Sequence, residues 1–241
     1  NLTIAMWDGT EWTEVPSTTT GTASSGSITT NSPVSDFSNR YFALGYKASL
    51  PKTYVPDDNF EAYLEANSMG DGIANNDSVF TISISGVTNI DVSGLNIADL
   101  TGIEDFTAIN SLNGGNNQIT SLNLSNNTAL SDLICFNNLL TSLDLSNLTF
   151  SNNNFGIGGH ISCDNNQLTS LDLSSITDLN QLVCNNNQLT SLDVSNNTSL
   201  TLLVCDYNQL TSLDLRNGNY TNMTLFGSLN NPNLNCISVD D

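Results

Sequence analysis

The sequence predicts a mainly β solenoid, in which short coils of chain stack along one axis. The first observation is repetition, because five segments read almost alike: QITSLNLSNN, LLTSLDLSNL, QLTSLDLSSI, QLTSLDVSNN and QLTSLDLRNG. Their equivalent apolar residues are spaced by 21, 28, 21 and 21 positions, a period typical of solenoids; these residues are Ile119, Leu140, Leu168, Leu189 and Leu210. Secondly, leucines alternate with polar residues, so one side of an extended strand can point inward and stack on neighbouring coils. Thirdly, the remaining Ser, Asn, Asp and Thr residues have low helix propensity, which favours parallel β-strands on both faces of each coil.

The chain divides into three predicted parts. Residues 1–50 combine β-forming clusters with Ser/Thr/Gly-rich stretches and predict three strands. Three strands with little apolar sequence make a poor independent domain, so we expect either the tail of an upstream β-sandwich or a small sheet docked on the next part of the chain. Residues 51–78 predict a linker and a helical N-terminal cap, and residues 79–241 predict the repeat domain with a C-terminal cap. The 28-residue coil carries an insertion around residues 150–159.

A short amphipathic helix is predicted in front of the repeats. Asp57 or Asp58 is suited to cap the segment NFEAYLEAN, which places Phe60, Tyr63 and Leu64 on one face. Such a helix can cover the first coil, whose apolar edge would otherwise meet water. The segment VFTISIS, further along the chain, is expected to be a strand.

The charge balance limits the partners of the chain. There are 24 acidic residues against four basic ones, a formal net charge of −20. Nucleic acids and anionic membranes both attract basic proteins, so both are excluded as partners. No apolar stretch is long enough to span a bilayer, so we expect no membrane insertion in this chain. Cationic partners or divalent cations suit this surface. The chain begins at Asn1 and is expected to be a piece of a larger protein.

Four of the five cysteines occupy the same repeat position, and they are Cys135, Cys163, Cys184 and Cys205. On adjacent coils they would lie about 4.8 Å apart, beyond the ~3.5–4.5 Å between Cβ atoms that a disulfide requires. They are therefore expected to form a ladder of buried thiols. Zinc is the alternative, but its ligands converge on a point whereas these run along a line. Cys236 falls outside the ladder and is assigned to the terminal cap.

From Val87 onward the chain resembles leucine-rich repeat proteins. More narrowly, it resembles a short 21-residue bacterial class with the pattern L-x-x-L-x-C-x-x-N-x-L-T-x-L-D-L-S-x-N-T, which occurs in secreted and cell-surface proteins of gliding bacteria. The resemblance implies a leucine-rich repeat solenoid in an extracellular or cell-surface module. In this pattern an Asn follows the first strand of each coil, where its side chain can satisfy backbone groups that the turn leaves unpaired. These residues are Asn117, Asn138, Asn166, Asn187, Asn208 and Asn231.

Candidate binding residues lie where the coils differ. The residues flanking the second Leu and the Cys of each repeat are expected to point outward from the first sheet. They combine a broken apolar row with Asp, Asn, one Phe and the single His, which suggests a ligand-binding patch. Its members are Asp132, Ile134, Phe136, His160, Asp164, Val183, Asn185, Val204 and Asp206. The alternative is that the β-branched members merely favour strands and stack on one another.

The opposite face carries an acidic row, and its members are Asn123, Asp144, Asp172, Asp193 and Asp214. Carboxylates in register about 5 Å apart repel, by about 1 kcal/mol even in water. Hydrogen bonds from nearby Ser, Thr and loop amides would relieve the repulsion, and bound Ca²⁺ is the alternative.

A second calcium candidate follows the cap helix. Related bacterial repeat proteins often carry an EF-hand-like loop there, and this resemblance would place Asn67, Met69 and Asp71 at the first, third and fifth ligand positions before the turn at Gly72. Met cannot ligate Ca²⁺ usefully, and Ser78 replaces the closing Glu. What remains is a weak metal site formed by Asp71, Asn75 and Asp77. No other cofactor is expected.

These features predict a non-catalytic binding module, because the chain has no phosphate-binding loop, zinc-protease motif or nucleophile elbow. We expect it to recognise a protein or a glycan at a cell surface, with adhesion as its use. Two alternatives stay open. The chain could be a structural spacer in a large modular surface protein, or an accessory module of a polysaccharide-degrading enzyme. The latter expects exposed aromatic residues, and the regular coils offer only Phe136 and Tyr207.

Overall fold

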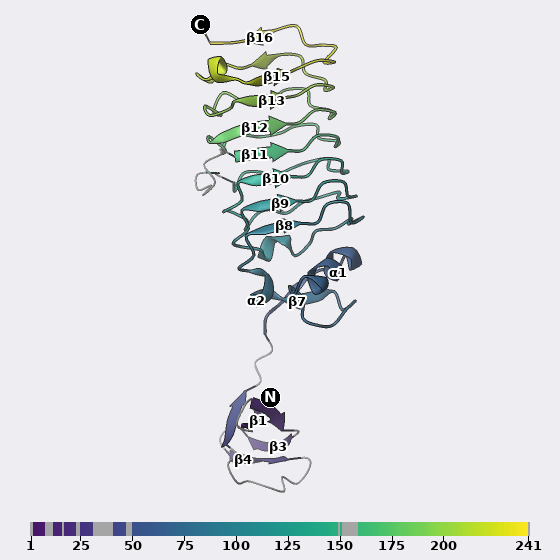
Figure 1. The fold of residues 1–241 in the computed structure, drawn as a ribbon, viewed down its shortest axis with the longest axis vertical. Helices are drawn as coiled ribbons and strands as arrows, with labels where there is room; N and C mark the ends of the chain where they lie inside the picture. The colour runs from purple at the N-terminus through teal and green to yellow at the C-terminus, as the bar shows by residue number, and fades with distance from the viewer. Residues whose placement is uncertain are drawn as a thin grey trace. The chain divides into compact units, whose positions relative to one another are not determined.

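The computed structural model describes residues 50–148, 150 and 159–240, together with the backbone of five strands within residues 1–49. The chain separates into two compact units, Asn1–Leu50 and Pro51–Asp241, which are described one at a time (Figure 1). The insertion predicted around residues 150–159 falls mostly outside the described residues.

The first unit is an antiparallel β structure. A three-stranded sheet has the order β2-β1-β5, and β3 pairs with β4 as a hairpin. The strands are β1 Leu2–Trp7, β2 Trp12–Val15, β3 Ser17–Thr22, β4 Ser25–Thr30 and β5 Tyr41–Tyr46. The first unit thus contains five strands where three were predicted, and the polar run from Ser17 to Thr30, whose composition suits either a loop or a hairpin, forms the hairpin. That this unit is the tail of a larger sandwich stays a prediction.

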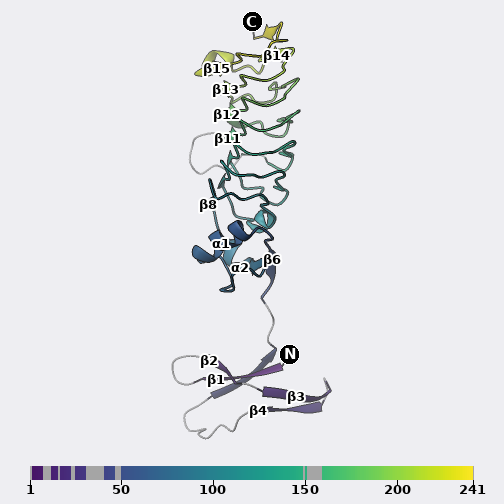
Figure 2. The same ribbon diagram turned by 90° about the vertical axis from the view of Figure 1, so that its right-hand side faces the viewer.

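The second unit opens with a cap of β6 Lys52–Tyr54, α1 Asp58–Ala66, β7 Ser78–Phe80 and the short helix α2 Thr81–Ile84 (Figures 1 and 2). Asp57 caps α1: its Oδ1 accepts hydrogen bonds from the backbone N–H groups of Asn59 and Phe60, at 3.0 and 3.1 Å. Its Oδ2 accepts from Ala98 N, at 2.8 Å, which ties the helix to the first coil. The strand predicted for VFTISIS ends at Phe80, because the chain turns helical from Thr81.

The cap helix covers the apolar edge of the first coil, as predicted. Phe60 and Leu64 are fully buried, and the Phe60 ring stacks on Phe106 with centroids 6.3 Å apart. The amphipathic spacing of α1 therefore places its apolar residues in the same core as the repeats. In the described part of the chain, none of the helices has the length and apolarity that a bilayer crossing requires.

The repeats form a solenoid with a seven-stranded parallel sheet of order β15-β13-β12-β11-β10-β9-β8. Its strands are β8 Asn89–Asp91, β9 Ser111–Asn113, β10 Asp132–Ile134, β11 Gly159–Ser162, β12 Leu179–Val183, β13 Leu202–Val204 and β15 Leu225–Gly227. The unit also contains two 3₁₀ turns, Ile103–Asp105 and Tyr220–Asn222. This confirms the predicted mainly β solenoid.

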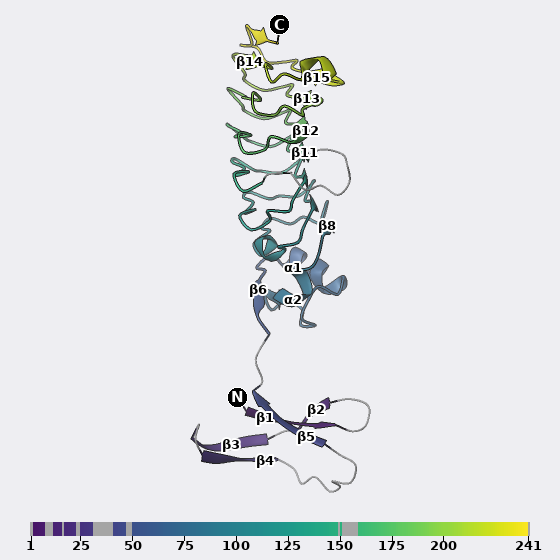
Figure 3. The same ribbon diagram turned by 90° about the vertical axis from the view of Figure 1, so that its left-hand side faces the viewer.

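The second face of the solenoid is less regular than the first. In the described residues it forms a sheet only near the C-terminal end, where β14 Leu213–Asp214 pairs with β16 Ile237–Ser238 (Figure 3). A single bridge joins Asp193 to Asp214. In the other coils this segment ends in a turn whose Asp or Asn side chain already binds a backbone N–H group, as Asp172 binds that of Ser174. Local bonds of this kind compete with sheet ladders.

The cysteine ladder is buried as predicted. Cys135, Cys163, Cys184 and Cys205 are at most 1 % exposed, and all are free thiols. Burial raises the pKa of Cys135 and Cys205 to about 12, and it raises the pKa values of Cys163 and Cys184 well above the usual range. The protonated thiols therefore act as small apolar side chains of the core. Cys236 lies outside the ladder and is exposed.

A second ladder, of asparagines, bonds each coil to its neighbour. The Asn187 side chain accepts a hydrogen bond from Leu168 N at 2.9 Å, and donates to the carbonyls of Cys163 and Cys184 at 3.0 and 3.2 Å. The pattern recurs at every described coil junction, and its members are Asn117, Asn138, Asn166, Asn187, Asn208 and Asn231. These residues are at most 8 % exposed, so the predicted role in the turns is confirmed.

The substitution Asn187→Ala tests this ladder. It leaves the Leu168 N–H buried without its partner, which costs about 1–3 kcal/mol, and it removes one of the two amide donors of the Cys163 and Cys184 carbonyls, which keep Asn166 and Asn208. We expect a loss of at least about 2 kcal/mol in the free energy of unfolding, measured by urea denaturation. Asn185→Ala, on the solvent side of the same coil, should change it by less than about 0.5 kcal/mol. Equal losses for the two variants would contradict the assignment.

Candidate functional site

The outward face of the seven-stranded sheet carries all nine predicted binding residues. We call this surface the outward face, and it is made of three rows that run across the strands in register. The first row is Asp132, His160, Gln181, Leu202 and Leu225. The second row is Ile134, Ser162, Val183, Val204 and Gly227. The backbone bonds at the strand ends place Phe136, Asp164, Asn185, Asp206 and Leu229 in the third row. The structure thus assembles the predicted residues, while their role in binding stays a prediction.

The N-terminal half of the outward face is a polar network. Asp132 accepts hydrogen bonds from His160 Nδ1 and from Ser111 Oγ, both at 2.8 Å. The bond from His160 holds the pKa of the Asp132 carboxyl below its usual value. Asp164 accepts from Ser162 Oγ at 2.8 Å. The Ser111 hydroxyl bonds to Asp132 rather than to the imidazole, so this group lacks the nucleophile–base contact of serine hydrolases.

The predicted apolar row is less exposed than its sequence suggests. Ile134, Val183 and Val204 are half-buried in the sheet surface. The ring of Phe136 lies over Gly115, where an added Cβ would come within 2.8 Å of the Phe136 ring. Phe136 is thus packed against the preceding coil and is not a free aromatic platform.

Sequence reasoning missed the most exposed apolar residues of this face. Leu225 is 51 % exposed and Leu229 is 72 % exposed, both at the C-terminal edge of the sheet. The signal was present in the outward residues of the last coil, which are Leu-Gly-Leu, whereas each earlier coil carries at least one Asp, Ser or Asn at these positions. The repeat motif did not indicate these residues, because the last coil departs from the LTSLDL pattern.

The acidic row of the second face is held by local hydrogen bonds. Asp144, Asp172 and Asp193 each accept from the backbone N–H of the serine two residues further on, at 2.9 Å. These backbone N–H groups and the serine hydroxyls lower the pKa of each carboxyl below its usual value. Arg216 pairs with Asp214 and lowers its pKa to about 2. This agrees with the hydrogen-bonding explanation of the row and does not require calcium.

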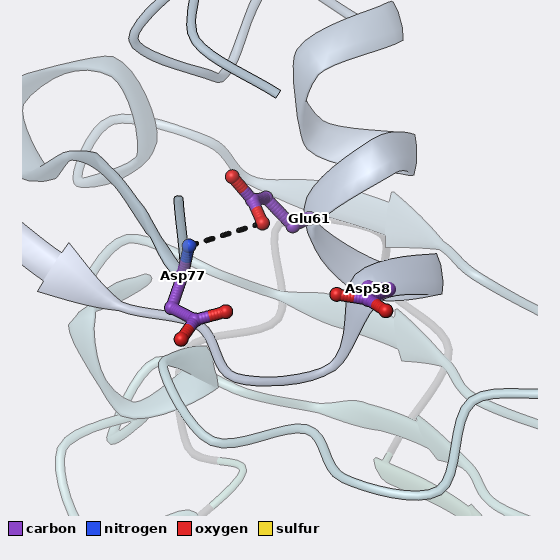
Figure 4. A group of neighbouring side chains, drawn as sticks. All are labelled: Asp58, Glu61 and Asp77. Atoms are coloured by element: carbon purple, nitrogen blue, oxygen red, sulfur yellow. Dashed lines mark hydrogen bonds between the residues drawn. The ribbon is translucent and has the colours of Figure 1, made fainter. Parts of the chain in front are cut away.

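The three predicted metal-binding residues have different surroundings in the structure, and their role as ligands stays a prediction. Asp71 is bound by Lys52 Nζ at 2.5 Å and by Asn76, and Asn75 lies exposed in a turn with φ of 56°. Asp77 instead meets two carboxylates of α1, those of Asp58 and Glu61 (Figure 4).

The carboxylate group in Figure 4 can supply one oxygen from each residue, with all three oxygens within 4.8 Å of one another. Glu61 is buried, and its two oxygens accept hydrogen bonds from Asn76 N and Asp77 N, at 3.0 and 3.2 Å. Asp58 and Asp77 are exposed. Clustered carboxylate oxygens are the ligands that Ca²⁺ prefers. Of the predicted metal ligands, only Asp77 belongs to this group.

No family model matches the chain, and no curated protein matches it. Among solved structures, the leucine-rich repeat domain of APL1 is similar with a TM-score of 0.51 and 22 % identity, covering 67 % of this chain and 42 % of that one. This chain has the leucine-rich repeat fold. The functional domain of InlJ from Listeria monocytogenes, described as including a cysteine ladder, is similar to this leucine-rich repeat chain at 23 % identity over 80 % of it, with a TM-score of 0.30. An internalin from the same organism, inlF, shares 19 % identity over 78 % of the chain, with a TM-score of 0.34.

The leucine-rich repeat chain spans 62 % of the InlJ domain and 42 % of the APL1 domain. The likeness to the APL1 domain shows the fold, and the narrower 21-residue bacterial class stays a prediction.

Asp71 makes the stability of the leucine-rich repeat unit depend on pH. The hydrogen bond from Lys52 lowers the pKa of Asp71 to about 2, against about 3.9 in an unfolded chain. A lowered carboxyl pKa contributes stability above the unfolded pKa, and this stability is lost as the pH falls. We expect Asp71→Asn to melt below the wild type at pH 7, with the difference shrinking between about pH 4 and pH 2. Lys52→Met should behave alike, whereas a gap that stays constant with pH would contradict this role.

Proposed function

We propose that this chain is a non-catalytic protein-binding module and that its outward face is the binding surface. One observation carries the proposal. The residues that the coils share are used by the fold itself: leucines and cysteines in the core, asparagines between coils, and aspartates in the turns of the second face. The residues that differ between coils gather on the outward face, where side chains from successive strands lie in register and stay accessible.

Protein recognition fits this surface better than glycan recognition does. The three rows of the outward face combine carboxylates with exposed leucines, and the Phe136 ring in them is packed over Gly115, which leaves Tyr207, at the edge of the face, as the exposed ring beside these rows. Sugar-binding surfaces rely on exposed aromatic rings with a polar handle. We further propose a secreted or cell-surface location and a use in adhesion, as the resemblance to exported bacterial repeat proteins implies.

The structural-spacer alternative predicts that changes on the outward face are harmless. We therefore compare two double variants that add the same charge. Gln181→Arg with Asn185→Arg places two bulky cations on the outward face, and Thr169→Arg with Thr190→Arg places them on exposed positions of the second face. Each pair replaces side chains that the core does not use.

We expect the outward-face variant to lose the partners that the wild-type chain retains on a column, at unchanged melting temperature. The second-face variant should retain them. The measurement is affinity capture from extracts of the producing cells and from their culture medium, with the captured proteins quantified by mass spectrometry. If both variants capture the same proteins as the wild type, the spacer alternative gains and the proposal fails.

We also propose that the cap binds a divalent cation of the Ca²⁺ type through the carboxylates of Asp58, Glu61 and Asp77, which converge in Figure 4. A cation that binds only the folded state raises the melting temperature as its concentration exceeds the Kd. We expect Ca²⁺ to raise it for the wild type but not for Asp58→Asn with Asp77→Asn. A matched variant, Asp144→Asn with Asp172→Asn, removes two charges elsewhere and should keep the effect. Equal melting temperatures in Ca²⁺ and in chelator would refute the site.

A further inference from the structure

The C-terminal edge of the outward face contains a carboxylate that the fold leaves without a cation. Asp206 follows β13, and its Oδ1 accepts a hydrogen bond from Leu229 N at 2.5 Å. Its other oxygen lies over Gly227, since a Cβ added there would come within 2.9 Å of Asp206 Oδ2. Within the described residues no ion pair involves Asp206, and Arg216, the only basic residue of the repeats, is bound to Asp214 on the second face.

Two exposed leucines flank this carboxylate. Leu225, Gly227 and Leu229 alternate along the outward side of the last strand and its end, and the Asp206 carboxylate occupies the space above the glycine. The two leucines are 51 % and 72 % exposed. A negative charge therefore lies beside two apolar side chains, and a partner that covers these leucines would exclude water and strengthen the attraction between the carboxylate and a cation.

Tyr207, the next residue after Asp206, is an independent observation that indicates a function at this position. It has a φ of 52°, in the left-handed region, and its side chain is 56 % exposed. The equivalent turn position is Gly94 in the first coil and asparagine in the other described coils, and these asparagines are Asn116, Asn137, Asn165, Asn186 and Asn230. Asparagine tolerates this conformation, whereas a bulky residue is strained there. Strain of this kind at an exposed position points to a function other than folding.

We propose that Asp206, Tyr207, Leu225 and Leu229 form an anchor site for an arginine side chain of a protein partner, with apolar residues on either side of that arginine. The proposal rests on the proposed function and names the partner chemistry of the same outward face. The guanidinium would bond to Asp206 Oδ2, its apolar stem and the flanking residues would contact the two leucines, and its plane can stack on the tyrosine ring. The acidic chain, with a net charge of −20, favours the approach of such a partner.

The spacing of the site specifies a simple probe. In an extended peptide, residues i, i+2 and i+4 lie on one side, which is also the spacing of Leu225, Gly227 and Leu229. A peptide with the core Leu-Ser-Arg-Ser-Leu therefore presents arginine between two leucines. Replacing its arginine by citrulline keeps the shape and removes the charge.

The test is a titration of the ¹⁵N-labelled full chain with each peptide, up to about 5 mM, because short peptides bind weakly. We expect the arginine peptide to shift the amide signals of Asp206, Tyr207, Gly227 and Leu229. The citrulline peptide should bind at least about tenfold more weakly, the loss expected for one charge-assisted hydrogen bond. No shift with the arginine peptide, or equal affinity for both peptides, would overturn the proposal.

Variants distinguish binding at this site from a non-specific attraction between the peptide and the acidic chain. Asp206→Asn keeps an oxygen for Leu229 N and should abolish the preference for arginine over citrulline, whereas Asp193→Asn, which removes the same charge from the second face, should leave it unchanged. Tyr207→Asn should raise the melting temperature, since the strain is released, and weaken the arginine peptide several-fold. If Asp193→Asn weakens binding as much as Asp206→Asn does, the attraction is non-specific and the site is rejected.

Failure of this site is distinguishable from failure of the proposed function. If the peptide shifts signals of β9 to β12 instead, the anchor site is wrong while the outward face remains the binding surface. If the Gln181→Arg, Asn185→Arg variant still captures every partner, the proposed function fails whatever the peptide does.

Discussion

The hydrogen bonds of the asparagine ladder are the constraint on which the rest of this structure depends. Coils of about 21 residues are too short to satisfy their own backbone, because each turn after a strand leaves N–H and C=O groups pointing inward. One buried asparagine per coil satisfies these groups. Its side-chain oxygen accepts a hydrogen bond from a backbone N–H of the preceding coil, and its side-chain nitrogen donates to carbonyls of the preceding coil and of its own coil. Asn187 makes these bonds with Leu168 N, Cys163 O and Cys184 O. Since each asparagine needs the neighbouring coil, the coils are stable only as a stack. The parallel register of the outward rows is a direct consequence.

Because the buried asparagines fix the strand register, the residue types on the outward face can vary without changing the fold. Row positions change from Asp132 and His160 to Leu202 and Leu225 while the strands keep their parallel pairing. This freedom explains why the face divides into a polar half, whose carboxylates bond to Ser111, Ser162 and His160, and an apolar half with the uncompensated Asp206. A partner would meet two chemically different areas on one rigid surface.

The sequence predicted the solenoid, the buried thiols, the asparagine turns and the helix that covers the first coil, because each follows from a residue type recurring at a fixed spacing. It predicted less well what depends on one particular neighbour. The sequence suggested an exposed ring at Phe136, but the ring packs over Gly115 in the preceding coil. The sequence suggested a metal ligand at Asp71, but its carboxylate forms an ion pair with Lys52, which lies on β6 before the cap helix. Asp58 and Glu61 are not indicated as ligands by any sequence motif, since only folding brings α1 against the turn at Asp77.

The acidity of the chain has two different physical origins, and only one of them concerns partners. The aspartates of the second face are required by the fold: each one closes its turn through a backbone N–H, and that bond keeps the carboxyl ionised with a lowered pKa. Their charge is thus a by-product of turn formation and says little about a ligand. Asp206 has one oxygen bonded to Leu229 N and the other above a glycine, between exposed leucines. Among the described residues no cationic side chain pairs with it. A cationic partner would supply that pair, so the position of a carboxylate, rather than the net charge, indicates where recognition takes place.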